Sequence, residues 1–291
     1  MEYLAKPSDA GRRLDVVVAD LYPDFTRSSL ELLFDKDMVS VDGQAAKAAH
    51  KVRPKDKIVV DETYLKSEPP AADLPIIYED DDVTVINKPA GVLTHSKGAL
   101  NLEATVASFI KSKINDETLT GNRAGIVHRL DRGTSGVIIT AKNSKALKYL
   151  QKQFSQRRVK KSYVAVVEGV PQPPQAVIDA PIGRNPKTPQ TFKVISSGRP
   201  AATMYRILKE FKKDGKNYAL LELEPQTGRT HQIRVHLAYI GHPVVGDPIY
   251  GRGGGELLLH AAQLELTLPG GKRQIFKSPT PARIKKFTAD D

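Results

Sequence analysis

The stretch from residue 126 to residue 142, IVHRLDRGTSGVIITAK, holds the densest cluster of side chains that could do chemistry. Asp131 lies there in a polar connection between two apolar runs, with His128, Arg129 and Arg132 beside it. Positive charges near a carboxylate favour its ionised form. An ionised carboxylate at the mouth of a basic cleft can act as a nucleophile or a base. Asp131 is therefore a candidate catalytic group, and the alternative is a loop carboxylate that caps a turn or pairs with an arginine.

A second cluster, TGRTHQIRVHLAYIGHP, covers residues 227–243. A Pro-Gln-Thr-Gly turn follows an apolar strand and places Arg229 just before a helix that we expect Thr230 to cap. Gly241 and Pro243 are typical of the end of a helix. Arg229 at such a strand-to-helix junction is well placed to bind a ligand, and the alternative is an arginine tied to structural carbonyl groups.

Three further patterns suggest a hydrolase triad, a phosphate-binding loop and a metal site, but each lacks a required feature. His128, Asp131 and Ser135 suggest a hydrolase triad, but Gly-Thr-Ser-Gly lacks the five residues of a nucleophile elbow. The glycines between 251 and 255 lack the lysine of a phosphate-binding Walker loop and predict a mobile loop. Four histidines lie among arginines without a supporting carboxylate cluster, which argues against a metal site; they are His231, His236, His242 and His260. The sequence therefore predicts no metal and no cofactor.

The charge of the chain favours a polyanionic partner. The 291 residues include 44 Lys and Arg against 33 Asp and Glu, a net charge of +11. Residues 1–66 hold 11 basic and 12 acidic side chains, so the whole surplus belongs to the remainder. A basic surplus of this size is typical of nucleic-acid binding, and equally of a basic protein without such a partner.

The absence of cysteine excludes disulfides, thiolate catalysis and cysteine-bound metal clusters. The first fifteen residues are charged almost at once and do not resemble a signal peptide. No stretch approaches the roughly 20 apolar residues that span a bilayer. We therefore expect a cytoplasmic protein without a membrane partner.

Two regions differ in their patterns. Residues 11–61 predict a small α/β unit with two helices, the second capped by Thr26, and a hairpin turn at Asp42-Gly43. Residues 62–74 predict a polar, proline-containing linker. From residue 75 to residue 291 strands and helices mix, which predicts an α+β domain.

In this second region the apolar runs place strands over 83–89, 136–142, 162–169 and 217–225. Helices are expected over 101–110, capped by Asn101, and over 144–154. The basic, proline-rich segment from 171 to 189 separates two of the strands.

Residues 26–60, TRSSLELLFDKDMVSVDGQAAKAAHKVRPKDKIVV, resemble the S4-type RNA-binding domain, including the Asp-Gly turn and the Pro-Lys-Asp turn. Members of this family often carry more Lys and Arg on the second helix than LELLFDKD does. The resemblance therefore implies that this domain binds RNA weakly and acts as an arm that positions the RNA.

The second region closely resembles the RluA-type pseudouridine synthases through HRLDRGTSG and TGRTHQIRVHLAYIGHPVVGDPIYG. Further matches follow in the expected order over about residues 74–291. They are INKPAGVLTH, KKSYVAVVEG, GRPAATMYRIL, LLLHAAQLEL and FKSPTP. Gly133 departs from the pattern, because many members have an acidic residue there; we expect an altered loop rather than lost activity.

The resemblance implies a mixed, largely antiparallel sheet flanked by helices, with an RNA cleft across its face. It implies that Asp131 is the essential carboxylate and that Arg229 pairs with it. Tyr163 packs on the uracil and can move a proton, and Arg129 fills the gap left by the extruded base. Leu258 lines the uracil pocket.

His128 and Arg132, which flank the motif aspartate, are expected to contact the RNA substrate. The implied reaction, isomerisation of uridine to pseudouridine, gains and loses no atom and needs no cofactor. An S4-type unit implies large-subunit ribosomal RNA or pre-ribosomal particles as the partner, with transfer RNA as the alternative. A monomer is the default expectation.

Two other functions fit parts of the sequence. A catalytically silent RNA-binding or ribosome-assembly protein fits the charge but leaves Asp131, Tyr163 and Arg229 unexplained. A base-releasing glycosidase requires a pair of carboxylates, and the Asp131 motif contains no second acidic residue.

Overall fold

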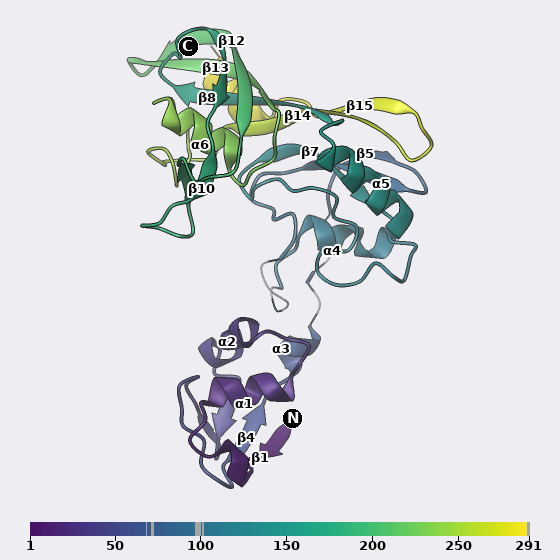
Figure 1. The fold of residues 1–291 in the computed structure, drawn as a ribbon, viewed down its shortest axis with the longest axis vertical. Helices are drawn as coiled ribbons and strands as arrows, with labels where there is room; N and C mark the ends of the chain where they lie inside the picture. Colours follow the sequence, from purple (N-terminus) through teal and green to yellow (C-terminus); the bar gives the residue numbers. More distant parts are fainter. Residues whose placement is uncertain (68, 71–72, 97–99, 101, 290–291) are drawn as a thin grey trace. The chain divides into compact units, whose positions relative to one another are not determined.

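The computed structural model describes residues 1–67, 69–70, 73–96, 100 and 102–289, which form two compact units (Figure 1). The N-terminal unit comprises residues 1–72 and 95–108, and the C-terminal unit comprises residues 73–94 and 109–291. None of the helices found in the described residues has the length and apolar character needed to cross a membrane.

The N-terminal unit packs two helices, α1 (Leu14–Leu21) and α2 (Arg27–Asp35), on a small antiparallel sheet. Its strands lie in the order β1 (Glu2–Leu4), β4 (Lys57–Val60), β2 (Val39–Val41) and β3 (Gln44–Ala45). The Thr26 hydroxyl accepts a hydrogen bond from the Ser29 backbone and caps α2, as predicted. Asp42 and Gly43 take positive φ angles of 50° and 82° in the β2–β3 turn, as an Asp-Gly hairpin requires.

The compact unit is larger than the predicted span of 11–61. Strand β1 pairs with β4, and a short 3-10 helix, η1 (Pro7–Asp9), follows it. The predicted linker contains one helical turn, α3 (Thr63–Lys66).

The helix expected over 101–110 is shorter than predicted. Asn101 lies outside the described residues, and α4 covers only Val106–Ile110, followed by the 3-10 helix η2 (Lys111–Lys113). The Thr105 hydroxyl accepts a hydrogen bond from the Ser108 backbone at 3.0 Å, and the Ser108 hydroxyl accepts one from the Thr105 backbone at 2.8 Å. This reciprocal cap makes Thr105 the start of the helix.

The C-terminal unit is built on a nine-stranded sheet in which the β7–β14 pair is parallel and the other pairs are antiparallel. The main path runs β5-β6-β7-β14-β8-β13-β12-β9, and β15 pairs with β14. The strands are β5 (Ile76–Glu79), β6 (Val83–Lys88), β7 (Ser135–Ala141), β8 (Lys160–Glu168), β9 (Gln175–Asp179), β12 (Ala202–Lys213), β13 (Lys216–Pro225), β14 (Leu259–Thr267) and β15 (Arg273–Lys277). The prediction of a mixed, largely antiparallel sheet is confirmed.

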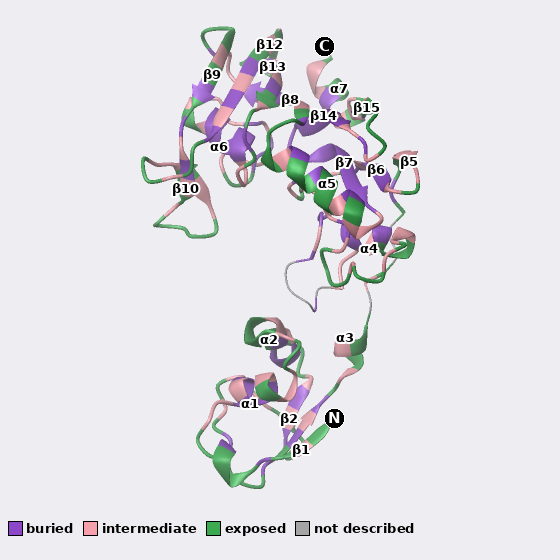
Figure 2. Cartoon of the chain, turned by 45° about the vertical axis from the view of Figure 1, so that its right-hand side comes forward, coloured by how far each residue is buried: buried purple, intermediate pink, exposed green. Residues whose placement is uncertain are grey.

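The segments with the clearest hydrophobic patterns form the strands and the helix that these patterns predict. Every residue of β7 is buried, as its unbroken apolar run indicates (Figure 2). Helix α5 (Ser144–Ser155) is capped by the Asn143 side chain and buries Ala146 and Leu150 against the sheet. The predicted strands over β6, β8 and β13 are also present.

The proline-rich segment from 171 to 189 is more structured than expected. It contains β9 and also β10 (Ile182–Arg184), which pairs with β11 (Phe192–Val194) in a separate two-stranded hairpin. Helix α6 (Gln232–Tyr239) packs beside this hairpin and against β12 and β13, and α7 (Ala282–Thr288) packs on the other face of β8. The Phe192 amide of the β10–β11 hairpin donates to the Tyr250 hydroxyl at 3.0 Å.

The two halves of the large sheet meet where β7 lies parallel to β14. Gly136 pairs with Ala261 there at a φ of +117°, a backbone conformation that favours glycine. A Cβ atom at this position would lie 2.1 Å from the Ala261 carbonyl oxygen. Only glycine therefore allows the chain that leaves Asp131 to join the centre of the sheet.

Replacing Gly136 with alanine should destabilise the C-terminal unit by about 3 kcal/mol, because the methyl group meets backbone and φ is strained. Gly270→Ala is the matched control, since a Cβ atom there would have no atom within 4 Å and its φ is not positive. Urea unfolding of both variants checks the prediction. Equal stabilities for the two variants would contradict it.

Candidate active site

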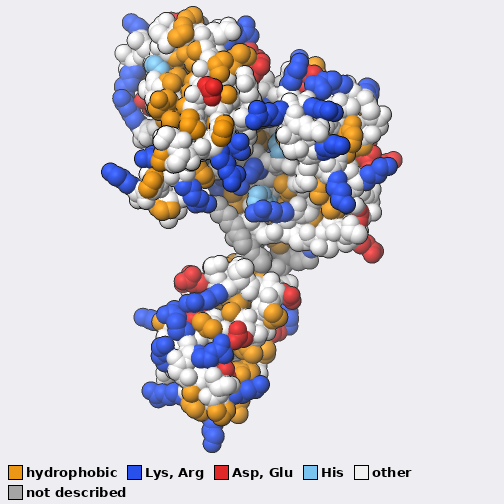
Figure 3. Space-filling view, in the orientation of Figure 1, with side chains coloured by type: hydrophobic (Ala, Val, Ile, Leu, Met, Phe, Trp, Pro, Cys, Tyr) orange, Lys and Arg blue, Asp and Glu red, His pale blue; other side chains and the backbone are white. Residues whose placement is uncertain are grey.

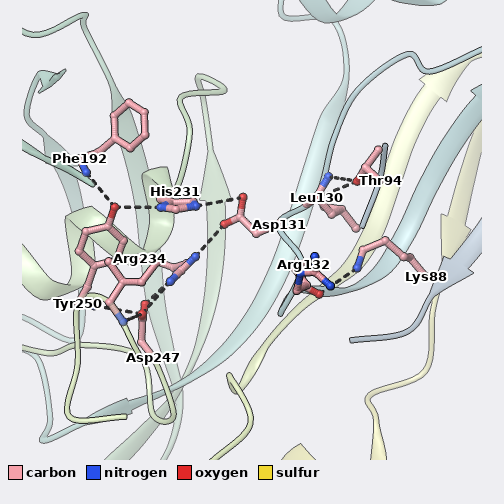
Figure 4. A network of polar contacts seen from close by, with 11 residues as sticks. Lys88, Thr94, Leu130, Asp131, Arg132, Phe192, His231, Arg234, Asp247 and Tyr250 are labelled. Atoms are coloured by element: carbon pink, nitrogen blue, oxygen red, sulfur yellow. Dashed lines mark hydrogen bonds and ion pairs between the residues drawn. The ribbon is translucent and has the colours of Figure 1, made fainter. Parts of the chain in front are cut away.

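Asp131 lies in a loop that the segment following β6 holds in place (Figure 4). The Thr94 hydroxyl donates to the Leu130 carbonyl at 2.8 Å and accepts from the Leu130 amide at 3.1 Å. On the other side of Asp131, the Gly91 amide donates to the Arg132 carbonyl at 2.8 Å. The backbone on both sides of the carboxylate is therefore fixed to the segment that follows β6.

Lys88, at the end of β6, strengthens this attachment although its side chain is fully buried. Its Nζ donates to the carbonyl oxygens of Pro89 at 2.9 Å, Val92 at 2.8 Å and Arg132 at 3.3 Å. Burial lowers the pKa of Lys88 to about 7, and the charge of Asp131 opposes that shift. Lys88 thus links the segment that follows β6 to the loop of Asp131.

The guanidinium that reaches Asp131 is that of Arg234, on α6. Its Nη1 donates to Asp131 Oδ2 at 3.3 Å. Its Nε and Nη2 each donate to Asp247 at 2.7 Å, so the group is clamped in a bidentate pair. Burial disfavours the charge of Arg234, but Asp247 and then Asp131 outweigh it and raise its pKa.

Asp247 is fully buried and has four donors. Besides the two from Arg234, the Ile249 and Tyr250 amides donate to its Oδ1 at 2.9 and 3.1 Å. Burial alone would raise the pKa of Asp247, but Arg234 and these amides lower it below its usual value. Asp247 therefore remains an anion that fixes the orientation of Arg234.

The prediction that Arg229 pairs with Asp131 is wrong. Arg229 Nε donates to the Pro200 carbonyl at 3.1 Å. Thr230 does not cap the helix either, because α6 begins after His231, which has a left-handed φ of 55°. The left-handed turn at His231 directs Arg234, one turn later, toward Asp131.

His231 contacts the second oxygen of the carboxylate. Its Nε2 lies 3.8 Å from Asp131 Oδ1, and its Nδ1 lies 2.9 Å from the Tyr250 hydroxyl. Burial lowers the pKa of His231, with the charge of Asp131 acting in the opposite direction. The Asp131 side chain itself is 17% exposed, so it is held from two sides but open to a substrate.

Tyr163 lies on β8, on the face that carries α6. Burial and then the charge of Asp131 raise the pKa of Tyr163, so the phenol is protonated. No other described residue forms a hydrogen bond with its hydroxyl. Tyr163 therefore offers an aromatic ring and an unused phenol group close to the carboxylate.

Leu258 lies on the opposite face of the sheet. It packs with Val166 and Ile284 beneath α7, whereas Leu257 belongs to the cluster that contains Tyr163. A Cβ atom at Gly133 would lie 3.2 Å from the Leu257 side chain. The structure thus places Leu257, rather than Leu258, in the apolar cluster that contains Tyr163, contrary to the expected position of Leu258.

The other residues of the Asp131 motif have separate positions. His128 stacks on Phe154 with ring centres 4.6 Å apart and accepts a hydrogen bond from the Ile139 amide at 3.2 Å. Burial lowers the pKa of His128 to about 3, which makes it a neutral structural group. Arg129 is exposed, and Arg132 Nη1 donates to the Gly91 carbonyl at 3.3 Å. Arg129 and Arg132, unlike His128, are thus placed to meet a substrate.

The four histidines considered as a metal site have different partners. His236 contacts Thr203 and the Ala180 carbonyl, and His242 contacts the Glu168 carbonyl. His260 contacts Ser135 at 2.8 Å. Within the described part of the chain no group of three or more His, Asp or Glu residues could hold a metal ion.

Comparison with known proteins gives one consistent family. The family model for RNA pseudouridylate synthase matches residues 82–239. The chain is 40% identical over 295 residues to an uncharacterised RNA pseudouridine synthase of Chloroflexus aurantiacus, covering 96% of this chain and 90% of that protein. It is 39% identical over 289 residues to ribosomal large subunit pseudouridine synthase D of Nitrosomonas europaea, covering 94% and 82%.

A solved structure agrees with these relatives. Human RNA pseudouridylate synthase domain containing 1 superimposes with a TM-score of 0.61 at 30% identity, over 74% of this chain and 87% of that chain. Fold, sequence and the open carboxylate site together define an RNA-modifying isomerase. The chain belongs to the RNA pseudouridylate synthase family, in its RluA-type branch, and converts uridine to pseudouridine within RNA.

Arg234→Lys should slow conversion of bound RNA about a hundredfold, because lysine cannot hold Asp247 and Asp131 at once. Arg229→Lys, the matched control, should convert RNA at close to the wild-type rate. Single-turnover rates and RNA dissociation constants of both variants check this. The assignment fails if Arg229→Lys is the slower variant.

The low pKa of His128 predicts a pH dependence of stability. Its folded value of about 3 lies below the usual value of 6.5, so its contribution is complete above pH 6.5 and is lost as the pH falls toward 3. Between pH 7 and pH 5 the wild type should lose about 2 kcal/mol more stability than His128→Gln. Urea unfolding at the two pH values measures this difference, and parallel losses would rule out the lowered pKa of His128.

Proposed function

We propose that this enzyme modifies uridines of large-subunit ribosomal RNA and that Asp131 carries the reaction. The observation that supports Asp131 is its carboxylate, 17% exposed and held between Arg234 and His231 in a loop fixed by Thr94 and Lys88. Support for the substrate comes from the relatives named ribosomal large subunit pseudouridine synthase D, one of them 39% identical over 94% of this chain.

The reaction breaks the N1–C1′ bond of uridine, turns the uracil, and joins its C5 atom to C1′. Because the target base is stacked in RNA, it must first be turned out of the stack, which costs a few kcal/mol. Asp131 can then attack the sugar, attack the ring, or remove a sugar proton. All three roles require an oriented carboxylate, and the hydrogen bond from Arg234 fixes that orientation.

The neighbouring groups have complementary roles in this proposal. Tyr163 stacks on the flipped uracil, and its protonated phenol can move a proton during the rearrangement. Leu257 provides an apolar wall beside the ring. Arg129, exposed two residues before Asp131, occupies the gap that the base leaves in the RNA.

The RNA grip comes mainly from the C-terminal unit. Lys, Arg and His side chains gather where the two halves of this unit meet (Figure 3). We assign residues 11–61 to an S4-type arm of modest affinity, because its region carries no basic surplus and two of its arginines are already paired. Arg13 and Arg27 both contact Asp15, at 2.9 and 2.8 Å. This arm orients the RNA more than it attracts it.

We further propose that the enzyme works as a monomer in the cytoplasm, on free or pre-ribosomal large-subunit RNA. Transfer RNA is the alternative substrate, because the same site would accept any flipped uridine. The near-neutral charge of residues 1–66 gives no electrostatic preference between the two RNAs.

The test is release of tritium from RNA labelled at uracil C5. The wild-type enzyme should release tritium from large-subunit ribosomal RNA, and Asp131→Asn, which cannot ionise, should release none while it still binds RNA. Binding should weaken steeply with salt, because phosphate contacts release counterions. Activity on transfer RNA alone would show that transfer RNA, and not ribosomal RNA, is the substrate. An active Asp131→Asn variant would refute the catalytic role of Asp131.

A further inference from the structure

Beside Arg234, a chain of three groups from separate elements leads to the other carboxylate oxygen of Asp131 (Figure 4). The Phe192 amide, on β11, donates to the Tyr250 hydroxyl oxygen at 3.0 Å. The Tyr250 hydroxyl lies 2.9 Å from His231 Nδ1, and His231 Nε2 lies 3.8 Å from Asp131 Oδ1. None of these three groups has a role in the reaction proposed above.

The hydrogen atoms of these groups can be placed by counting donors. The Phe192 amide can only donate, so it occupies one lone pair of the Tyr250 oxygen. Among the described residues the Tyr250 hydroxyl has one remaining neighbour, His231 Nδ1. Burial raises the pKa of Tyr250, so its proton stays on the oxygen and needs an acceptor. The hydroxyl therefore donates to Nδ1, and the neutral imidazole carries its hydrogen on Nε2.

The other end of the imidazole agrees with this tautomer. Nε2 faces the carboxylate of Asp131, which only accepts hydrogen bonds. An unprotonated Nε2 would direct a lone pair at an anion. The charged groups around the ring are Asp131, Arg234, Asp247 and Arg129. Burial keeps the ring neutral, so the Nε2–H group is a fixed dipole and not a second cation.

We propose that His231 is a positioning residue that holds Asp131 Oδ1 through Nε2–H, in a tautomer set by Tyr250. This inference rests on the proposed catalytic role of Asp131. Arg234 restrains Oδ2 and His231 restrains Oδ1, so the carboxylate plane is defined from two directions. The separation of 3.8 Å exceeds a hydrogen bond, and we expect it to shorten when RNA fills the site.

The tautomer is anchored by the β10–β11 hairpin, since the group that holds Tyr250 is a backbone amide of this hairpin. Phe192 also meets the His231 ring edge to face, with centres 5.9 Å apart. The exposed cations Arg184, Lys187 and Lys193 lie on the same hairpin. A phosphate contact on the hairpin would therefore act on the element that orients His231.

The tautomer can be measured without any RNA. Nitrogen chemical shifts of the full chain labelled with ¹⁵N-histidine report which ring nitrogen carries hydrogen, and the signal of His231 is the one that His231→Gln removes. We expect Nε2–H in the wild type and a mixture of tautomers in Tyr250→Phe. A wild-type ring with hydrogen on Nδ1 would overturn the proposal.

Two substitutions of His231, each of which replaces only one of the two ring nitrogens with an amide, test the positioning role. Glutamine places an amide near Nε2 and keeps a donor for Asp131, whereas asparagine places its amide near Nδ1 and leaves Asp131 without one. We expect His231→Asn to convert saturated, bound RNA about tenfold more slowly than His231→Gln, with equal RNA dissociation constants. Asparagine tolerates the left-handed φ of this position better, so a purely structural role predicts the reverse order.

A double-mutant cycle tests whether Tyr250 affects the reaction through His231. Tyr250→Phe should slow the wild type but not His231→Gln, because an amide donor needs no partner to fix its tautomer. Equal losses in both backgrounds would overturn the link through Tyr250. A wild-type chain that releases no tritium from any RNA would refute the proposed function instead, and the tautomer measurement would still decide the present inference.

Discussion

The arrangement of the site depends on the buried pair of Arg234 and Asp247. Two guanidinium nitrogens donate to Asp247 at 2.7 Å, and the third donates to Asp131 at 3.3 Å. A buried ion pair often adds little net stability, because desolvation of the two charges offsets their attraction. Here the four donors around Asp247 satisfy the anion, and the rigid guanidinium gives Asp131 a fixed partner. The pair is best explained as a positioning device.

The second constraint is the attachment of the Asp131 loop to the rest of the sheet. Thr94 and Lys88 hold the backbone on either side of Asp131, and Gly136 then brings the chain into the parallel β7–β14 contact. Arg234 and Asp247 belong to the other half of the unit, around α6. The carboxylate therefore lies where the two halves of the sheet meet, and its geometry depends on the register between β7 and β14.

This dependence explains what the sequence could and could not predict. Strands β6, β7, β8 and β13 and helix α5 have clear local patterns, and Asp131 stands in a distinctive motif. The choice between Arg229 and Arg234 required the left-handed start of α6 at His231, which residue types alone do not indicate. Because α6 is buried from Gln232 to Leu237, its sequence also lacks the polar face that would have shown its orientation. Likewise, Leu257 and Leu258 pack in different clusters because the Leu258 carbonyl accepts a hydrogen bond from the Val166 amide of β8, a long-range contact.

The charge balance of the site follows from one guanidinium serving two carboxylates. Arg234 is closer to Asp247 than to Asp131, and His231 is kept neutral by burial, so Asp131 is oriented without being fully neutralised. A carboxylate that must attack carbon or remove a proton loses reactivity when a cation is bound tightly to it. A dipole such as Nε2–H can fix the second oxygen at a smaller loss of charge density than a second arginine. The site thus orients the Asp131 carboxylate firmly, while the cations that attract RNA lie farther out on the surface.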